Sequence, residues 1–229
     1  SLGHEVGVDG PDDVALGPDG SVYWTDILAG EVGRLAPDGT WTKQYVADGV
    51  NPIAFDEKGR LFVGQAFFGD GLYEVDPELV NPARTVIPDS TTPPYFAQLN
   101  GFDFDADGIL YAPQPFLGRI VKIDPDSDPA DTVPVVDLPA PAWSVEFAPD
   151  GRLFASLGDG RVLAIDTEEA TIDTVATIRG GDLDNMVFDR KGRLFVSDSN
   201  NGAVYVIGTG GGVRTLVKGG LILPGGIAV

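Results

Sequence analysis

The sequence contains no cysteine and a single histidine, and these two scarcities exclude several kinds of chemistry. Without cysteine the chain has no disulfide, no thiolate metal site and no cysteine nucleophile. Its one histidine, His4, lies near the amino terminus, so a Ser-His-Asp triad built on a central imidazole is not expected. A Gly-x-Ser-x-Gly nucleophile motif is also absent.

Basic residues are scarce as well, with 15 Lys and Arg against 35 Asp and Glu and a net charge of −20. A nucleic-acid partner needs a basic stripe, and the sequence has none. No apolar run approaches the ~18 residues of a membrane span. Most carboxylates are expected to lie on the surface in contact with water, and a few are expected to bind a cation. The location stays open, and an extracytoplasmic one is slightly favoured because the chain starts at Ser1, as after removal of a signal peptide.

What the sequence has in abundance is internal repetition. Five segments share an apolar triplet, a turn that ends in glycine and an alternating strand. They are VALGPDGSVYWTD (14–26), IAFDEKGRLFVGQ (53–65), FDFDADGILYAPQ (102–114), VEFAPDGRLFASL (145–157) and MVFDRKGRLFVSD (186–198). The turn glycines, 39 to 49 residues apart, are Gly20, Gly59, Gly108, Gly151 and Gly192.

Each segment predicts a β-hairpin, because an Asp or Lys before glycine suits a tight turn whose last residue has positive φ. The residues after the turn alternate, so one face packs against a neighbouring sheet. A third strand opened by glycine follows in every repeat (30–35, 71–76, 118–124, 160–166, 202–208), and then a more polar fourth strand, such as 41–47 or 174–180. Four strands every 40 to 45 residues or so indicate an all-β fold, a β-propeller of four-stranded blades.

The repeat predicts one propeller domain over residues 1–229, with five complete blades at about 11–50, 51–99, 100–142, 143–183 and 184–224. Residues 225–229 repeat the opening of a blade, and residues 1–10 resemble the outer strand that precedes one. Together they predict an incomplete sixth blade in a propeller of the six-bladed type. We favour truncation within that blade, because propellers usually close by pairing the two termini in one blade.

Aligning the repeats on their turn glycines predicts a ring of polar residues. The residues just before the innermost strands converge at one end of the central channel. In register these are Asp12, Asn51, Asn100, Trp143, Asp184 and Gly225. Carboxylate and amide oxygens are the ligands of hard cations such as Ca²⁺. Asp and Asn also cap turns, which is the simpler interpretation for any one of them, whereas the set favours a cation site.

The motif LDNMVFDRKGRLFVSD (183–198) carries the best resemblance to a known family. It is similar to the Asp-Gly-Met segment of the SMP-30/gluconolactonase/LRE-like family, which consists of calcium-dependent six-bladed propellers. In that family the aspartate binds calcium and is the proposed catalytic base, a role that the resemblance gives to Asp184. More loosely, the chain resembles the paraoxonase-like arylesterases, whose pair of calcium ligands is similar to Asp184 and Asn185.

Other ring positions match the family to different degrees. Asn100, in QLNGFDFDADG, stands where the family has a site asparagine, and Asp12 stands where it has a ligand glutamate one carbon longer. Trp143 occupies the place of a ligand asparagine and cannot bind calcium. The resemblance therefore implies the loss of one contact unless Asn51 or water replaces it.

Aromatic residues from loops on the side of the ring predict a pocket wall. The same residues also suit packing between blades, whereas a cup above a polar ring suits an ester, a lactone or another small hydrophobic ligand. The pocket residues are Phe67, Phe68, Tyr95, Phe96, Phe116 and Trp143. The polar segment SDSNNG (197–202) lies on this side too. GTGGGV (208–213) lacks the helix that a phosphate loop needs and predicts a flexible hairpin.

The interpretation we favour is an enzyme, a calcium-dependent hydrolase of lactones or related esters. The cation polarises the carbonyl while Asp184 accepts a proton from water. Its predicted ligands are Asp12, Asn51, Asn100, Asp184 and Asn185, and another divalent cation also fits them. Two alternatives stay open: a non-catalytic NHL-like propeller that binds a small ligand or a protein partner, and an enzyme similar to strictosidine synthase. The oligomeric state is not predicted.

Overall fold

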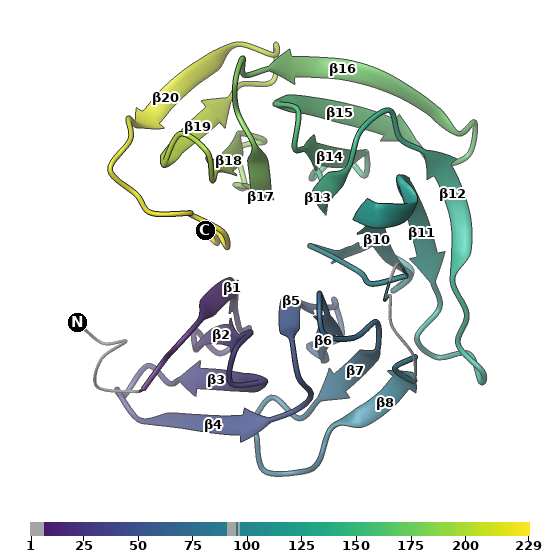
Figure 1. The fold of residues 1–229 in the computed structure, drawn as a ribbon, viewed down its shortest axis with the longest axis vertical. Coiled ribbons are helices and arrows are strands. Elements are labelled where there is room, and N and C mark those ends of the chain that lie inside the picture. Colours follow the sequence, from purple (N-terminus) through teal and green to yellow (C-terminus); the bar gives the residue numbers. More distant parts are fainter. Residues whose placement is uncertain (1–6, 91–94, 96) are drawn as a thin grey trace.

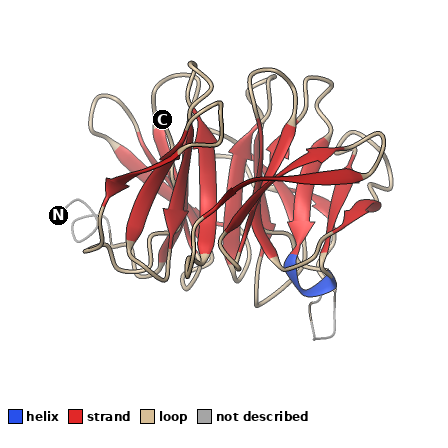
Figure 2. Cartoon of the chain, turned by 90° about the horizontal axis from the view of Figure 1, so that it is seen from above, coloured by secondary structure: helices blue, strands red, loops and turns tan. Residues whose placement is uncertain are grey.

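A computed structural model describes residues 7–90, 95 and 97–229 of the chain. Five four-stranded antiparallel sheets stand around a central axis like the blades of a propeller (Figure 1; Figure 2, from the side). Within every sheet the strands follow one another in chain order, so that each blade is a meander. The predicted all-β propeller with five complete blades is confirmed.

The blades are formed by the following strands. The first contains β1 (Pro11–Leu16), β2 (Val22–Asp26), β3 (Glu31–Leu35) and β4 (Trp41–Tyr45). The second contains β5 (Val50–Phe55), β6 (Leu61–Gln65), β7 (Leu72–Val75) and β8 (Arg84–Ile87). The third contains β9 (Asp103–Phe104), β10 (Leu110–Gln114), β11 (Arg119–Ile123) and β12 (Val133–Asp137). The fourth contains β13 (Ala142–Phe147), β14 (Leu153–Leu157), β15 (Arg161–Asp166) and β16 (Thr171–Thr177). The fifth contains β17 (Leu183–Phe188), β18 (Leu194–Asp198), β19 (Ala203–Ile207) and β20 (Val213–Val217).

The turn between the first two strands of every blade ends in a glycine with left-handed backbone. The φ angles at the five turn glycines lie between 72° and 85°, a region that residues with a Cβ rarely adopt. These glycines are Gly20, Gly59, Gly108, Gly151 and Gly192. The repeated glycine therefore sets the hairpin that starts each blade, as the sequence predicts.

Adjacent blades pack through a recurring pair of aromatic rings. One ring comes from the second strand of a blade, three residues after the turn glycine, and the other ends the innermost strand of the next blade. Four interfaces have this pair with ring centroids 5.0 to 5.2 Å apart: Tyr23–Phe55, Phe62–Phe104, Tyr111–Phe147 and Phe154–Phe188. Around them lie buried aliphatic side chains from both blades, so the core is divided into layers between the sheets.

The fifth and first blades are joined by the carboxyl-terminal segment. The Ser197 hydroxyl donates a 2.8 Å hydrogen bond to the Gly225 carbonyl, and the Gly226 N–H donates one of 2.8 Å to the Asp12 carbonyl. Residues 225–229, predicted to open a sixth blade, thus lie beside both neighbouring blades but form no strand. Of the predicted amino-terminal outer strand, residues 7–10 form a turn and a bend, and residues 1–6 lie outside the described residues.

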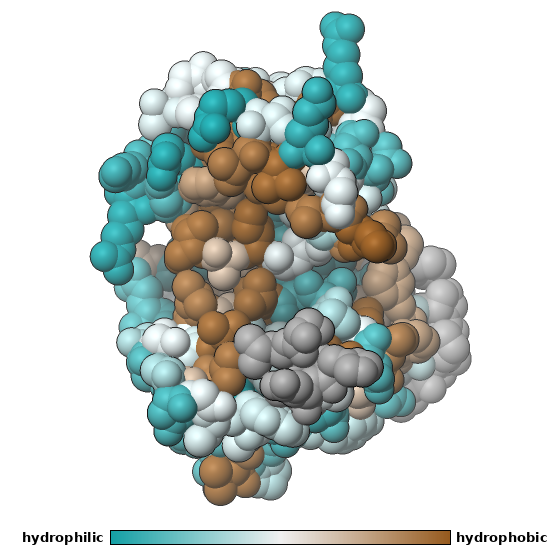
Figure 3. All heavy atoms as spheres, turned by 90° about the vertical axis from the view of Figure 1, so that its left-hand side faces the viewer, coloured by the Kyte–Doolittle hydropathy of each residue, from teal (hydrophilic) through white to brown (hydrophobic). Residues whose placement is uncertain are grey.

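The side of the molecule between these two blades exposes hydrophobic side chains. The carboxyl terminus lies on this side (Figure 1), and Figure 3 shows apolar residues gathered over it. Ile222 and Leu223, just before the residues that are hydrogen-bonded to the first blade, are 92% and 75% exposed.

The only helix among the described residues is a single 3₁₀ turn, η1 (Pro115–Leu117). No described helix has the length and apolar character needed to cross a membrane.

Because the aromatic pairs fill the space between blades, truncating one is expected to destabilise the whole ring. Phe62→Ala removes a side chain that is 0% exposed, and we expect a loss of about 3–5 kcal/mol in the free energy of unfolding. Val80→Ala, at a loop residue that is 77% exposed, is the control and should change it by less than about 0.5 kcal/mol. Urea unfolding followed by tryptophan fluorescence measures both, and equal effects would contradict this account of the packing.

Candidate functional site

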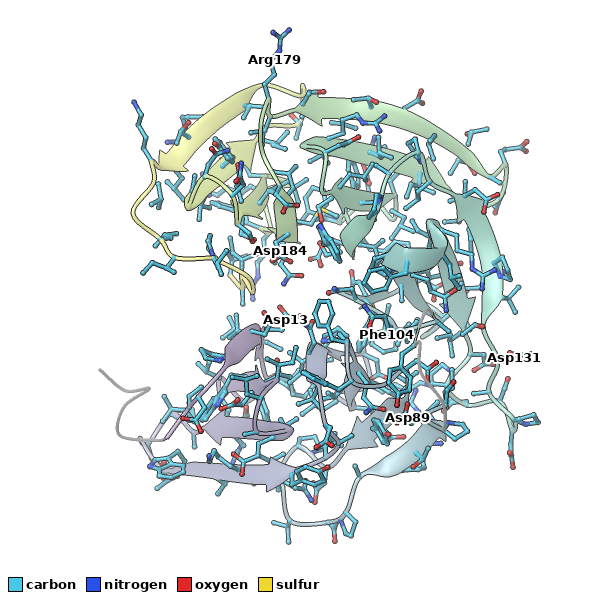
Figure 4. The ribbon with its side chains drawn as sticks, viewed as in Figure 1. Asp13, Asp89, Phe104, Asp131, Arg179 and Asp184 are labelled. Carbon is cyan, nitrogen blue, oxygen red and sulfur yellow. The ribbon has the colours of Figure 1, made fainter. Side chains whose placement is uncertain are left out.

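One end of the central channel contains a cavity of about 280 Å³ where innermost strands of all five blades begin or are about to begin. Its wall includes five of the six residues that the glycine alignment places in register, all except Gly225. Figure 4 shows Asp184 at the inner edge of the fifth blade, facing the channel. The lining residues are Asp12, Asn51, Phe67, Asn100, Trp143, Asp182, Asp184, Ser199 and Leu223.

Irregular pairing at the start of the innermost strands coincides with the ring positions. The register between the first and second strands shifts in four blades, and the ring residue lies within each shifted stretch: Asp12, Asn51, Trp143 and Asp184. A bulge of this kind releases a residue from the regular alternation and redirects its side chain. The local backbone therefore helps to direct these side chains toward the channel.

Half-buried Asp12 and buried Asn51 form a pair across the first blade interface. The Asn51 amide nitrogen donates a hydrogen bond to Asp12 Oδ2. Burial raises the pKa of the Asp12 carboxyl above its usual value, and the hydrogen bond from Asn51 partly offsets this rise. Asn51 is 4% exposed, and its Oδ1 atom has no hydrogen-bond partner among the described residues. An unpaired buried amide oxygen is costly, which makes this atom a candidate acceptor or ligand for a bound group.

Hydrogen bonds hold Asp184 in place at its backbone carbonyl and at its side-chain carboxylate. The Ser144 and Ser156 hydroxyls donate to its backbone carbonyl, Ser144 at 3.0 Å. The Ser199 hydroxyl lies 3.0 Å from Asp184 Oδ2 and donates to it. Burial, with a further contribution from the negative charge of Asp12, raises the pKa of Asp184 to about 6. The carboxyl thus has a fixed position and a proton affinity suited to acid–base chemistry near neutral pH.

Asn100 and Trp143 complete the ring in different ways. Asn100 is 5% exposed, and its Oδ1 accepts a 2.9 Å hydrogen bond from the backbone N–H of Gly101. The Trp143 indole N–H donates to Asp182 Oδ1 at 3.2 Å. Trp143 therefore contributes an apolar ring to the wall, with its one polar atom already engaged.

The cavity could hold a hard cation only by combining carboxylate oxygens with amide oxygens. Among the described residues no three His, Cys, Asp or Glu side chains are grouped closely enough to hold a metal ion. A cation here would rely on the carboxylates of Asp12 and Asp184 together with amide oxygens, of which Asn51 Oδ1 is unpaired. Among the described residues, no Lys or Arg lines the cavity. Burial is the main cause that raises the pKa of both carboxyls.

The predicted aromatic wall is only partly at the cavity. Phe67 and Trp143 line it, and Phe67 meets Phe116 edge-on with ring centroids 6.5 Å apart. Phe68 is 53% exposed and Tyr95 is half-buried, and neither lines the cavity. Phe96 lies outside the described residues.

Three lining residues were not among the residues predicted for the site: Asp182, Ser199 and Leu223. Ser199 belongs to the polar segment 197–202 that the sequence places on this side, so its position carried a signal. Asp182 lies two residues before the ring position of the fifth blade, accepts the hydrogen bond from Trp143, and adds negative charge beside Asp184. Leu223 belongs to the segment that joins the fifth and first blades.

Asn185 lies in a second cavity, of about 230 Å³, further along the channel. Its amide nitrogen donates a 2.7 Å hydrogen bond to Asp13 Oδ1, and burial is the main cause that raises the pKa of Asp13. Two more carboxylates, of half-buried residues, line this cavity and join consecutive blades. Asp103 accepts from the Phe147 N–H at 2.7 Å, and Glu146 accepts from the Phe188 N–H at 3.4 Å.

Comparison with known proteins finds part of the chain similar to lactonases and its fold similar to solved propeller structures. No family model matches the chain. Lactonase drp35 of Staphylococcus haemolyticus is 33% identical over 123 residues, which cover 48% of this chain and 38% of that protein. Its counterpart from Staphylococcus aureus strain USA300 is 34% identical over 125 residues with the same coverage. The matched region thus spans less than half the length of these curated relatives.

Solved structures agree on the fold. A gluconolactonase from Xanthomonas campestris superposes with a TM-score of 0.76 at 17% identity, covering 95% of this chain and 78% of the other. Virginiamycin B lyase from Staphylococcus aureus gives 0.72 at 14% identity, covering 95% and 73%. Together with the sequence matches, these structures support the predicted resemblance to the SMP-30/gluconolactonase-like propellers.

The buried carboxylates of the second cavity predict a pH-dependent stability. Burial raises the pKa of Asp103 from 3.8 to about 6, so the folded state binds this proton more tightly than the unfolded state. The contribution of Asp103 to the free energy of unfolding is therefore fully present below about pH 4 and is lost as the pH rises through about 6. Compared with Asp103→Asn, the wild type should lose at most about 3 kcal/mol of its free energy of unfolding as the pH rises through this range.

Urea unfolding at several pH values measures this difference, and Asp107→Asn, in an exposed turn, controls for the loss of one charge. A wild type that gains stability relative to Asp103→Asn over the same pH range would contradict the assignment.

Proposed function

We propose that the chain forms the catalytic part of a lactone hydrolase that uses a divalent cation, with calcium the first candidate. The observation that carries this proposal is the cavity in which Asp184, with a pKa of about 6, faces Asp12 and the unpaired Oδ1 of buried Asn51. The names of the similar lactonases and of the similar gluconolactonase support the same class of substrate.

Asp12, Asp184, Asn51 and Asn100 are the residues that would hold the cation. Oxygen ligands of this kind are those that calcium prefers. When bound, the cation polarises the lactone carbonyl and stabilises the negative charge that develops on its oxygen. Asn185, the remaining predicted ligand, donates its amide to Asp13 in the second cavity, so its contribution is the weakest of the set.

Asp184 is the proposed general base. In its ionised form it accepts a proton from the water that attacks the lactone carbonyl. The Ser199 hydrogen bond fixes the orientation of the carboxylate, and the serine hydroxyls on its backbone carbonyl fix the strand that carries it. Rigid support of this kind keeps the base within reach of its proton.

The lining restricts the substrate. A cavity of about 280 Å³ accommodates a small ring, and Phe67 and Trp143 offer it apolar surface. The lining contains three carboxylates and no cationic side chain, so an uncharged lactone is favoured over an anionic one.

A non-catalytic ligand-binding propeller is the second candidate. Trp143 supports it, because an indole whose N–H is engaged by Asp182 replaces a possible ligand to the cation. In this case the cavity would bind a small hydrophobic molecule without converting it.

Thermal unfolding in EDTA and in added calcium, for wild type and Asp184→Ala, tests the proposal. A cation that binds only the folded chain stabilises it by ~2.7 kcal/mol at one hundred times its dissociation constant. We expect this stabilisation in the wild type and its loss in Asp184→Ala. We also expect hydrolysis of small neutral lactones by the wild type, reduced by a factor of about 10²–10⁴ in the variant.

Asp107→Ala, in an exposed turn far along the strand from the ring, is the matched control and should retain both properties. Calcium stabilisation without lactone hydrolysis would favour the ligand-binding candidate. If calcium changes neither the stability nor the activity, the aspartates serve only as turn caps and the proposal fails.

A further inference from the structure

A further cavity lies away from the ring, between the fourth and fifth blades. It has a volume of about 380 Å³ and is bordered by the turns 149–151 and 190–192, at the opposite ends of the innermost strands from Trp143 and Asp184. Its apolar lining includes the aromatic pair Phe154–Phe188 and several aliphatic side chains. Three cationic side chains, Arg152, Arg190 and Lys191, also line it, in a chain whose net charge is −20.

Two other blade interfaces contain an ion pair between blades near the same position, with the arginine from the hairpin at one and from the third strand at the other. At the second interface Arg60 lies over the Phe62 ring at 5.2 Å and binds Asp126 of the next blade at 2.5 Å. At the first, Arg34 binds Glu78 of the next blade at 3.2 Å. Asp126 and Glu78 are equivalent, since each lies three residues after the residue that ends a third strand, Ile123 and Val75.

The interface between the fourth and fifth blades has an arginine at the position of Arg60 but no acidic residue at the position of Asp126. Arg152 directly follows its turn glycine, as Arg60 does, and lies over the Phe154 ring at 5.3 Å. The residue equivalent to Asp126 is Gly210, three residues after Ile207, in the glycine-rich turn between β19 and β20. Among the described residues, Arg152 is paired only with Asp150 of its own turn, at 2.9 Å.

The neighbouring cations leave further positive charge unmatched. Arg190 and Lys191 are exposed, and neither side chain forms an ion pair with a described residue. The turn 208–212 adds backbone and the Thr209 side chain but no carboxylate to this wall. At the second interface the equivalent arginine binds two carboxylates, Asp56 and Asp126, so a second acidic partner for Arg152 fits the pattern of the repeat.

We propose that this cavity is a binding site for a small carboxylate with an apolar body, whose carboxylate takes the place that Asp126 occupies at the second interface. The planar guanidinium of Arg152 matches a carboxylate, with Arg190 and Lys191 adding positive charge at the rim. The apolar body lies on the floor formed by Phe154, Phe188, Leu194 and Ile207. The Asp150 carboxylate also lines the cavity and favours a ligand with a single negative charge.

Titration calorimetry with hexanoate tests this site, with acetate and hexanamide as comparison ligands. We expect saturable binding of hexanoate, at least about tenfold weaker binding of acetate, which lacks the apolar chain, and still weaker binding of the uncharged hexanamide. High salt should weaken hexanoate binding, because part of the attraction is electrostatic. No saturable binding of hexanoate in the millimolar range, or equal binding of all three molecules, would overturn the proposal.

Two variants test the structural origin of the site. Gly210→Asp restores the acid of the other interfaces and should weaken hexanoate binding at least about tenfold while leaving the melting temperature unchanged or higher. A Cβ at Gly210 meets no atom within 4 Å and its φ is not positive, so the fold accepts the substitution. Arg152→Gln should weaken binding as much.

Arg179→Gln removes an exposed arginine that Figure 4 shows pointing away from the molecule, and it should bind hexanoate as the wild type does. Asp184→Ala should also bind it normally, since the site does not depend on lactone hydrolysis. Undiminished binding by Gly210→Asp and Arg152→Gln would place hexanoate elsewhere and refute the assignment.

Discussion

The aromatic pair at each blade interface is the contact on which the rest of the structure depends. One ring stands three residues after a turn glycine and the other four residues before the next one, so every pair links equivalent positions of consecutive repeats. With ring centroids 5.0 to 5.2 Å apart in edge-on or tilted contact, the four pairs repeat the same packing between consecutive blades. This repeated packing holds the blades so that the first residues of the innermost strands meet around one central cavity. The site is thus a consequence of packing at the opposite ends of the same strands.

The fold could be predicted because its signals are local and repeated five times. Turn glycines with positive φ, alternating strands and a constant order of strands need no knowledge of distant contacts. Alignment on the glycines even placed Asp12, Asn51, Asn100, Trp143 and Asp184 at one cavity. What this alignment cannot show is the direction of each side chain within an irregular strand. Asn185 follows Asp184 directly, yet it faces Asp13 in the second cavity.

Loop residues escaped prediction for a related reason. Asp182 and Ser199 reach the cavity from segments that flank the regular strands, and no periodicity fixes their place. Likewise, the missing acid at Gly210 is visible in the sequence only after the structure shows that Asp126 and Glu78 serve equivalent interfaces. Repetition makes such gaps detectable, because each interface provides a standard against which the others can be compared.

Charge is divided between the central channel and one blade interface. Among the described residues, the lining of the two channel cavities includes carboxylates and no Lys or Arg, and burial raises the pKa of the Asp13, Asp103, Glu146 and Asp184 carboxyls. The interface between the fourth and fifth blades has the opposite character. Carboxylates therefore gather in the channel, and unpaired cationic side chains gather near the edge, of a chain whose net charge is −20.

The segment from Leu223 to Gly226 belongs to no blade and lies beside both aspartates of the ring. The Ser199 hydroxyl that donates to Asp184 also lies 3.1 Å from the Pro224 carbonyl, and two residues later the Gly226 N–H donates to the Asp12 carbonyl. Leu223 itself lines the same cavity. The connection that joins the fifth blade to the first is therefore also part of the wall of the site, so a change in this segment would alter the surroundings of both aspartates without touching any strand.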